Sequence, residues 1–85
     1  MYQVTIKKSA AKELESLPKK VLLPITQAIV KLSGNPRPVG CKKLKGQTEN
    51  IWRIRVGNYR VVYEIKDIIK IVDIQKVGHR KDIYE

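Results

Sequence analysis

The sequence predicts an α+β domain in which two helices pack on one face of an antiparallel sheet. Three observations lead to this prediction. Apolar and polar residues alternate from Tyr2 to Ile6, apolar residues recur at helical spacing from Ala10 to Leu32, and three apolar, β-branched runs follow residue 50. A chain of 85 residues is long enough for one modest core, so we expect residues 1–85 to form a single domain.

The first third of the chain predicts a strand followed by a helical hairpin. Ser9 is expected to cap the first helix, and Pro18 is expected to end it. The second helix should stop before Gly34, and its apolar face consists of Val21, Leu22, Ile25, Ile29 and Leu32. Pro24 lies beyond the first turn of that helix, so we expect it to kink the helix or to delay its start.

The rest of the chain predicts a connecting loop and a three-stranded antiparallel meander. Residues 35–45, NPRPVGCKKLK, are expected to form a basic loop. Strands are expected over residues 51–56, 59–66 and about 70–77, with a polar tail over 78–85. Gly57 and Asn58 fit a two-residue type II′ turn, because only glycine takes the positive φ of its first position without strain.

This turn predicts the register of the hairpin and the side of the sheet on which each side chain lies. Arg55 should face Arg60, and directly opposed residues project to the same side. One face then carries Trp52, Ile54, Val56, Tyr59, Val61 and Tyr63. The opposite face, which we call the arginine face, carries Arg53, Arg55 and Arg60, with Glu64 as the nearest carboxylate. We interpret it as an anion-binding face, and the alternative is a solvated surface of three arginines.

The charge balance indicates which partners the protein binds. The chain has 18 Lys and Arg against 8 Asp and Glu, a formal net charge of +10. Such a domain attracts polyanions, so nucleic acid is the leading partner class. An acidic protein or a membrane surface would suit the same charge, but no apolar run is long enough to span a bilayer. Lys42, Lys43, Lys45 and Lys81 are candidate RNA-binding residues.

The cysteine and acidic residues exclude several kinds of site. Cys41 is the only cysteine, so neither an intramolecular disulfide nor a zinc site of several thiolates is expected. Asp67, Asp73 and Asp82 are scattered among cations, and we expect no metal and no cofactor. The N-terminus lacks a signal-peptide core, and we expect a cytoplasmic protein.

Arginine suits a phosphodiester ligand, since its planar guanidinium binds phosphate oxygens bidentately and stays charged. Cleavage of RNA also needs a group that accepts a proton. His79 and Tyr84, on either side of Arg80 and Lys81, are the candidates. Tyr84 is the preferred base because neighbouring cations favour a phenolate. The alternatives are a turn residue at His79 and an aromatic anchor for the tail at Tyr84.

Three segments resemble the RelE/ParE superfamily of toxins from toxin–antitoxin pairs. They are KLKG at 43–46, WRIRVGNYRVVYEI at 52–65 and VGHRKDIY at 77–84. The resemblance implies a RelE-like fold and a cognate antitoxin. Members similar to RelE cut messenger RNA in the decoding site of the ribosome, where they also contact ribosomal RNA. Attack of the 2′-hydroxyl produces a cyclic phosphate, and translation is inhibited.

The resemblance also implies roles for individual residues. The strand residues of the family fall on Arg53 and Arg55, its central arginine on Arg60, and its C-terminal arginine and tyrosine on Arg80 and Tyr84. RelE itself has lysines where Arg53 and Arg55 stand. The leading hypothesis is therefore a metal-independent endoribonuclease, and the alternatives are a ParE-like gyrase poison and a non-toxic basic binding module.

Overall fold

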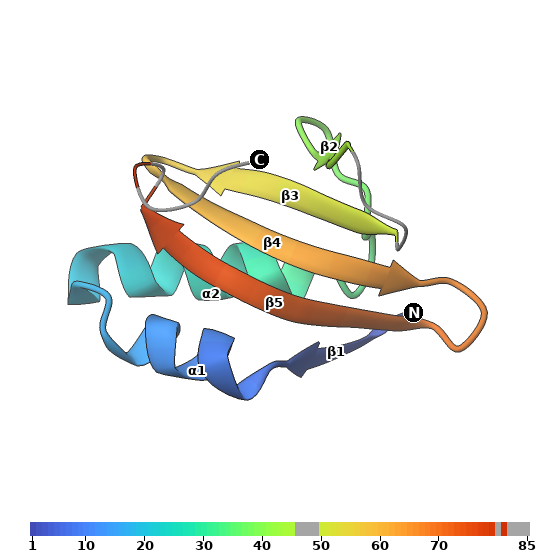
Figure 1. Cartoon of the computed structure of the whole chain (residues 1–85), viewed down its shortest axis with the longest axis horizontal. Helices are drawn as coiled ribbons and strands as arrows, with labels where there is room; N and C mark the ends of the chain where they lie inside the picture. Colours follow the sequence, from blue (N-terminus) through green and yellow to red (C-terminus); the bar gives the residue numbers. More distant parts are fainter. Residues whose placement is uncertain (46–49, 80, 82–85) are drawn as a thin grey trace.

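The computed structural model describes residues 1–45, 50–79 and 81 of the chain. Two helices lie on one side of a five-stranded sheet (Figure 1). The elements are β1 (Gln3–Ile6), α1 (Lys8–Glu15), α2 (Lys19–Lys31), β2 (Lys42–Lys43), β3 (Ile51–Val56), β4 (Tyr59–Lys66) and β5 (Ile71–His79). The order across the sheet is β1-β5-β4-β3-β2, with β1 parallel to β5 and the other pairs antiparallel. The predicted fold class and the meander of the last three strands are confirmed.

The core lies between the helices and the apolar face of the sheet. Ala10 of α1 and Ile25 of α2 are fully buried against the strands, as are Val61, Tyr63, Val72 and Ile74. The hydroxyl of Tyr63 donates a hydrogen bond to the carbonyl oxygen of Pro36 at 2.7 Å, so this polar group is satisfied inside the core. Burial raises the pKa of Tyr63, which keeps the phenol neutral.

The first helix begins earlier than the sequence indicated, and the second begins directly after Pro18. The first helix begins at Lys8 with Lys7 as its N-cap and no side-chain cap, so the prediction that Ser9 caps it is wrong. The reason is that the Lys7 N–H still bonds to the Ile74 carbonyl of β5 at 2.8 Å, and the chain passes directly from the sheet into the helix. Pro24 lies inside α2 and does not delay its start at Lys19.

The predicted basic loop contains a short strand. Lys42 and Lys43 form β2 and pair with Arg53 and Trp52 of β3, so the prediction of an unpaired loop is wrong for these two residues. A polar two-residue edge strand has no alternation that a sequence pattern could reveal. The last strand also runs further than expected, to His79, and an irregularity interrupts its pairing with β4 between Val62 and Tyr63.

The hairpin of β3 and β4 has the register that the turn predicts. All six pairs from Ile51↔Glu64 to Val56↔Tyr59 are present, including Arg55↔Arg60. Gly57 has φ +60°, whereas Asn58 does not have a positive φ, which is the combination of a type II′ turn. The arginines therefore lie on the face opposite to the core.

A carboxylate at the far end of the sheet joins four separate segments. Asp67, in the β4–β5 turn, accepts hydrogen bonds from the hydroxyl of Tyr2 at 2.6 Å, from Asn50 Nδ2 at 3.3 Å and from both terminal nitrogens of Arg37 at 3.2 and 2.9 Å. The Arg37 guanidinium also lies 5.2 Å from the ring centroid of Trp52. The bonds from Arg37 and then Tyr2 lower the pKa of Asp67 to about 2.

The turn conformation leads to a stability prediction. Gly57→Ala places a Cβ on a residue at φ +60°, and we expect a loss of about 1–2 kcal/mol in the free energy of unfolding. The matched control is Gly34→Ala, because Gly34 lacks a positive φ and its added Cβ would meet only the Lys31 carbonyl oxygen at 3.9 Å. Urea unfolding of both variants measures the difference, and equal losses would contradict a strained turn.

The Asp67 contacts lead to a prediction of pH dependence. Because the folded pKa of about 2 is below the ordinary 3.8, the unfolded chain takes up the proton first as the pH falls. This contribution to stability is complete above 3.8 and disappears as the pH falls through about 2. Asp67→Asn removes the titrating group, so its stability should change less with pH over that range. Parallel pH profiles of the two proteins would argue against the assignment.

Candidate functional site

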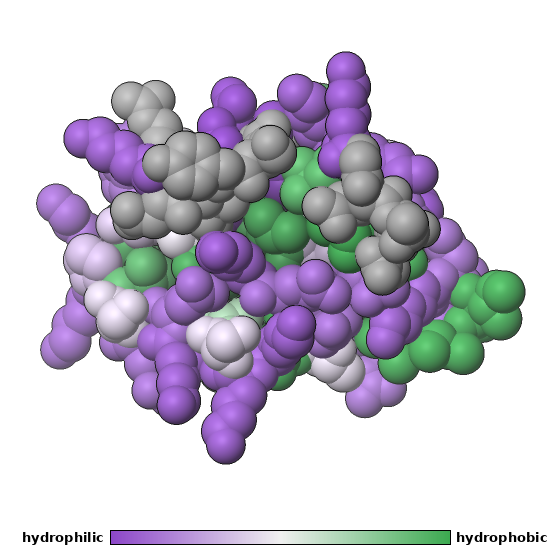
Figure 2. Space-filling view, in the orientation of Figure 1, coloured by the Kyte–Doolittle hydropathy of each residue, from purple (hydrophilic) through white to green (hydrophobic). Residues whose placement is uncertain are grey.

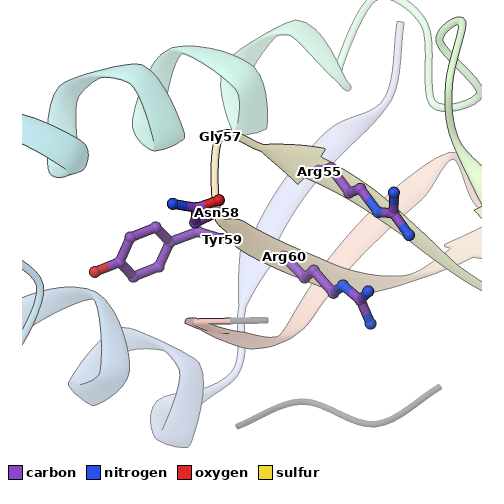
Figure 3. A pocket seen from close by; sticks show the side chains of 5 residues that line it. All are labelled: Arg55, Gly57, Asn58, Tyr59 and Arg60. Atoms are coloured by element: carbon purple, nitrogen blue, oxygen red, sulfur yellow. The ribbon is translucent and has the colours of Figure 1, made fainter. Parts of the chain in front are cut away.

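Two arginines stand directly opposite each other near the turn of the β3–β4 hairpin. Arg55 is exposed and Arg60 is half-buried. Their guanidiniums extend in the same direction from neighbouring strands, whereas the ring of Tyr59 points the other way (Figure 3). A surface cavity of about 110 Å³ lies here, lined by Arg55, Gly57, Asn58, Tyr59 and Arg60. Like charges directly opposite each other on neighbouring strands repel, which favours binding of an anion between them.

Arg53 lies on the same face but differs in its surroundings. Only 5% of its surface is exposed, so our expectation of three arginines on an open face is corrected at this position. The physical reason is the edge strand β2, which pairs with β3 at Arg53, together with a small apolar cluster on this face formed by Leu44, Ile51 and Val62. Arg53 and Arg55 still border one cavity of about 540 Å³ next to β2.

The four candidate lysines are exposed, but they do not all lie on the arginine face. Lys42 is paired with Arg53 and shares its side of the sheet, whereas Lys43 is paired with Trp52 and projects to the other side. Lys45 borders a cavity of about 150 Å³ together with Lys42 and Lys43. Lys81 follows the end of β5. Lys42 is thus the lysine of this group that the pairing places beside the arginines.

His79 is not brought to the arginine pair. It is paired with Tyr59, and the two rings form an edge-to-face contact with centroids 5.3 Å apart at 79°. Tyr59 packs against the core, so His79 lies on the helix side of the sheet. Its Nδ1 accepts a hydrogen bond from the Lys81 backbone N–H at 3.2 Å, as a turn residue does. The predicted site residues Arg80 and Tyr84 lie outside the described residues.

Lys76 is a further cation on the arginine face that was not predicted from the sequence. Lys76 of β5 is paired with Val62, which is paired with Arg53, so all three project to the same side. The sequence signal for its position was the spacing of Ile74 and Val77. Two buried residues separated by two others break strict alternation, and the break turns Lys76 away from the core.

The remaining polar contacts define what surrounds these cations. Within residues 1–45, 50–79 and 81, the ion pair is that of Arg37 with Asp67, at the other end of the sheet.

No group of three or more His, Cys, Asp or Glu side chains in that part of the chain could hold a metal ion. Neither described helix has the length and apolar character needed to cross a bilayer. In Figure 2, hydrophilic residues cover most of the visible surface.

The fold and the sequence both have known relatives. A sequence model of the family described as "ParE toxin of type II toxin-antitoxin system, parDE" matches residues 4–84. The chain belongs to the RelE/ParE superfamily of toxins. Toxin RelG from Mycobacterium tuberculosis is 36% identical over 84 residues, which are 98% of this chain and 95% of RelG. Toxin RelE from the same organism is 34% identical, over 98% of this chain and 86% of that protein.

Solved structures of RelE proteins have the same architecture. The structure of the archaeal RelE–RelB complex from Pyrococcus horikoshii contains a chain with 31% identity and a TM-score of 0.83, and the match covers 96% of this chain and 98% of that one. The isolated E. coli RelE toxin matches with 26% identity and a TM-score of 0.80, over 93% of this chain and 84% of that one. The predicted RelE-like fold is confirmed.

The opposed arginines lead to a prediction about stability. Arg55→Gln removes the repulsion with Arg60, and we expect the free energy of unfolding at low salt to rise by a few tenths to about 1 kcal/mol. The gain should shrink at high salt because ions screen the repulsion. Lys31→Gln on α2 is the matched control for the loss of one positive charge. A gain no larger than that of the control, measured by urea unfolding, would contradict the repulsion.

Proposed function

We propose that this chain is the toxin of a type II toxin–antitoxin pair and that it cuts messenger RNA on the ribosome without a metal ion. The observation that carries the proposal is the directly opposed pair Arg55 and Arg60, on the side of the sheet away from the helices and beside a surface cavity. Membership of the RelE/ParE superfamily supports the toxin assignment.

The two guanidiniums suit the charge that develops when RNA is cleaved. In the proposed step, the 2′-oxygen attacks the adjacent phosphorus, a new P–O bond forms, and the bond from phosphorus to the 5′-oxygen breaks. Negative charge grows on the phosphate oxygens, and arginines positioned beforehand stabilise that charge more in the transition state than in the bound RNA. Arg55 and Arg60 are assigned this role, and Arg53 and Arg80 are proposed to add positive charge around it.

A proton must also leave the 2′-hydroxyl, and a guanidinium cannot accept it. We assign the base to Tyr84 and the protonation of the 5′-oxygen to water. His79 receives no proton-transfer role in this proposal, because its ring contacts Tyr59 and its Nδ1 already accepts the Lys81 N–H. The products are a cyclic phosphate on one fragment and a 5′-hydroxyl on the other.

The proposed partners follow from the relatives and from charge. Solved relatives include RelE–RelB complexes from Pyrococcus horikoshii and E. coli, so we propose that a cognate antitoxin binds this chain. A net charge of +10 suits an acidic segment of such a partner. Lys42, Lys43, Lys45 and Lys81 are proposed to contact messenger or ribosomal RNA, and the site of action is proposed to be the cytoplasm.

Cleavage of a message bound to ribosomes tests this function. Arg60→Ala is expected to slow cleavage about 10²–10³-fold, because it removes a donor for the developing charge. Tyr84→Phe is expected to slow cleavage about 10²–10⁴-fold, because it removes the proposed base. Single-turnover rates on programmed ribosomes measure both effects, and Lys31→Gln should retain the normal rate. Growth arrest on induced expression with intact messages, judged by sequencing of RNA ends, would exclude the proposed activity.

A second candidate is a poison of DNA gyrase, since the matching family is described as that of ParE toxins. The discriminating measurement is supercoiling of a relaxed plasmid by gyrase with and without this protein. Inhibited supercoiling together with intact messages would establish the second function. Unaffected supercoiling together with cut messages would establish the first.

A further inference from the structure

The strand β5 contains an irregularity that changes which side chains reach the arginine face. Ile74 and Val77 are 0% and 1% exposed, and both belong to the core although two residues separate them. The pairing with β4 accommodates the extra residue: Val62 is opposite Lys76, whereas Tyr63 is opposite Ile74. Gln75 is therefore the additional residue of a β-bulge. Bulges of this kind often redirect a side chain next to a functional site.

The bulge places Lys76 in a row of side chains that crosses four strands. Lys42 of β2 is paired with Arg53 of β3, Arg53 with Val62 of β4, and Val62 with Lys76 of β5. Because neighbouring strands are about 4.8 Å apart, the backbone of Lys76 lies about 10 Å from that of Arg53 across the sheet. Without the bulge, Lys76 would point into the core.

The adjacent row has a glycine on β5, close to this lysine. Arg55 is opposite Arg60, and Arg60 is opposite Gly78 of β5. Glycine has no side chain, so nothing projects from that position between Arg60 and the edge of β5 next to Lys76. The arginine pair and the lysine thus border a common stretch of the sheet surface.

Two hydrogen bonds hold the bulge on either side of Lys76. The amide of Gln75 donates from Nε2 to Oε1 of Glu64 at 3.2 Å. The N–H of Val77 donates to Oε1 of Glu13 at 3.0 Å. A side chain of α1 thus satisfies a backbone N–H of β5 beyond the point where the pairing of β5 with β1 ends. These contacts hold the residues on either side of Lys76 to the sheet and to the helix.

Lys76 itself is exposed, and no described carboxylate lies within ion-pair distance of its ammonium. The bulge directs this cation onto a basic face, and it pairs with no carboxylate of the described chain. It is therefore suited to an external anion. A lysine supplies a compact charge on a flexible stem, which suits a phosphate whose position varies along a single strand.

We propose that Lys76 binds the phosphate backbone of the RNA and extends the binding face from the β3–β4 hairpin to β5. This inference rests on the proposed function, because it takes the RNA as the ligand. Lys76 acts in binding and has no part in the chemical step. The contact is with a phosphate and not with a base edge, so it should contribute equally for different sequences.

The experiment measures binding of the full chain to ribosomes programmed with a message that carries 2′-deoxynucleotides at the exposed codon and cannot be cut. Lys76→Gln is expected to weaken binding about 3–10-fold and to lower the slope of log affinity against log salt by about 0.7, the value for one phosphate contact to a single strand. Lys76→Arg keeps the charge and should bind like the unmodified protein. Lys31→Gln on α2 controls for the change in net charge.

The outcomes separate this inference from the function on which it rests. If Lys76→Gln and Lys31→Gln bind alike while the unmodified protein binds and cuts normally, Lys76 has no phosphate contact and the proposed function stands. If Lys76→Arg is as weak as Lys76→Gln, the loss comes from packing and the inference is wrong. If the unmodified protein neither binds nor cuts, the proposed function fails and this inference fails with it.

Discussion

The register of the β3–β4 hairpin is the constraint on which the rest of the structure depends. A shift of one residue would exchange the two faces, moving Tyr63 out of the core and the arginines into it. Gly57 at φ +60° and the burial of Ile54, Val61 and Tyr63 specify the observed pairing together. The same register places two guanidiniums against each other, and the core on the opposite face must offset their repulsion. Stability and anion binding therefore compete at one pair of positions.

The parts of the fold that were predictable from the sequence depend on neighbours along the chain. The turn at Gly57 and the alternation on either side of it are local signals, and all six pairs of the hairpin follow from them. The parallel pairing of β1 with β5 joins Gln3 to Ile71, and the Asp67 contacts join residues 2, 37 and 50. No local pattern specifies such distant partners, and β2 is too short and too polar to show one.

The candidate site also has parts that were predictable from the sequence and parts that were not. The side of the sheet on which Arg55 and Arg60 lie was predictable because one turn determines it. The burial of Arg53 was not, because it depends on β2 at the edge of the sheet. The position of His79 on the helix side depends on the register between β4 and β5, which the bulge at Gln75 interrupts. The side of the sheet on which Lys76 lies could have been predicted from the spacing of two buried residues, Ile74 and Val77.

The strand order has a consequence for synthesis of the protein. The last strand, β5, lies between β1 and β4, so an incomplete chain without β5 leaves β1 with no partner strand and separates it from the sheet of β2, β3 and β4 (Figure 1). A sheet made of one hairpin and a two-residue edge strand is marginally stable in water, and pairing between distant segments forms late. A stable basic surface therefore forms only after β5 has been synthesised.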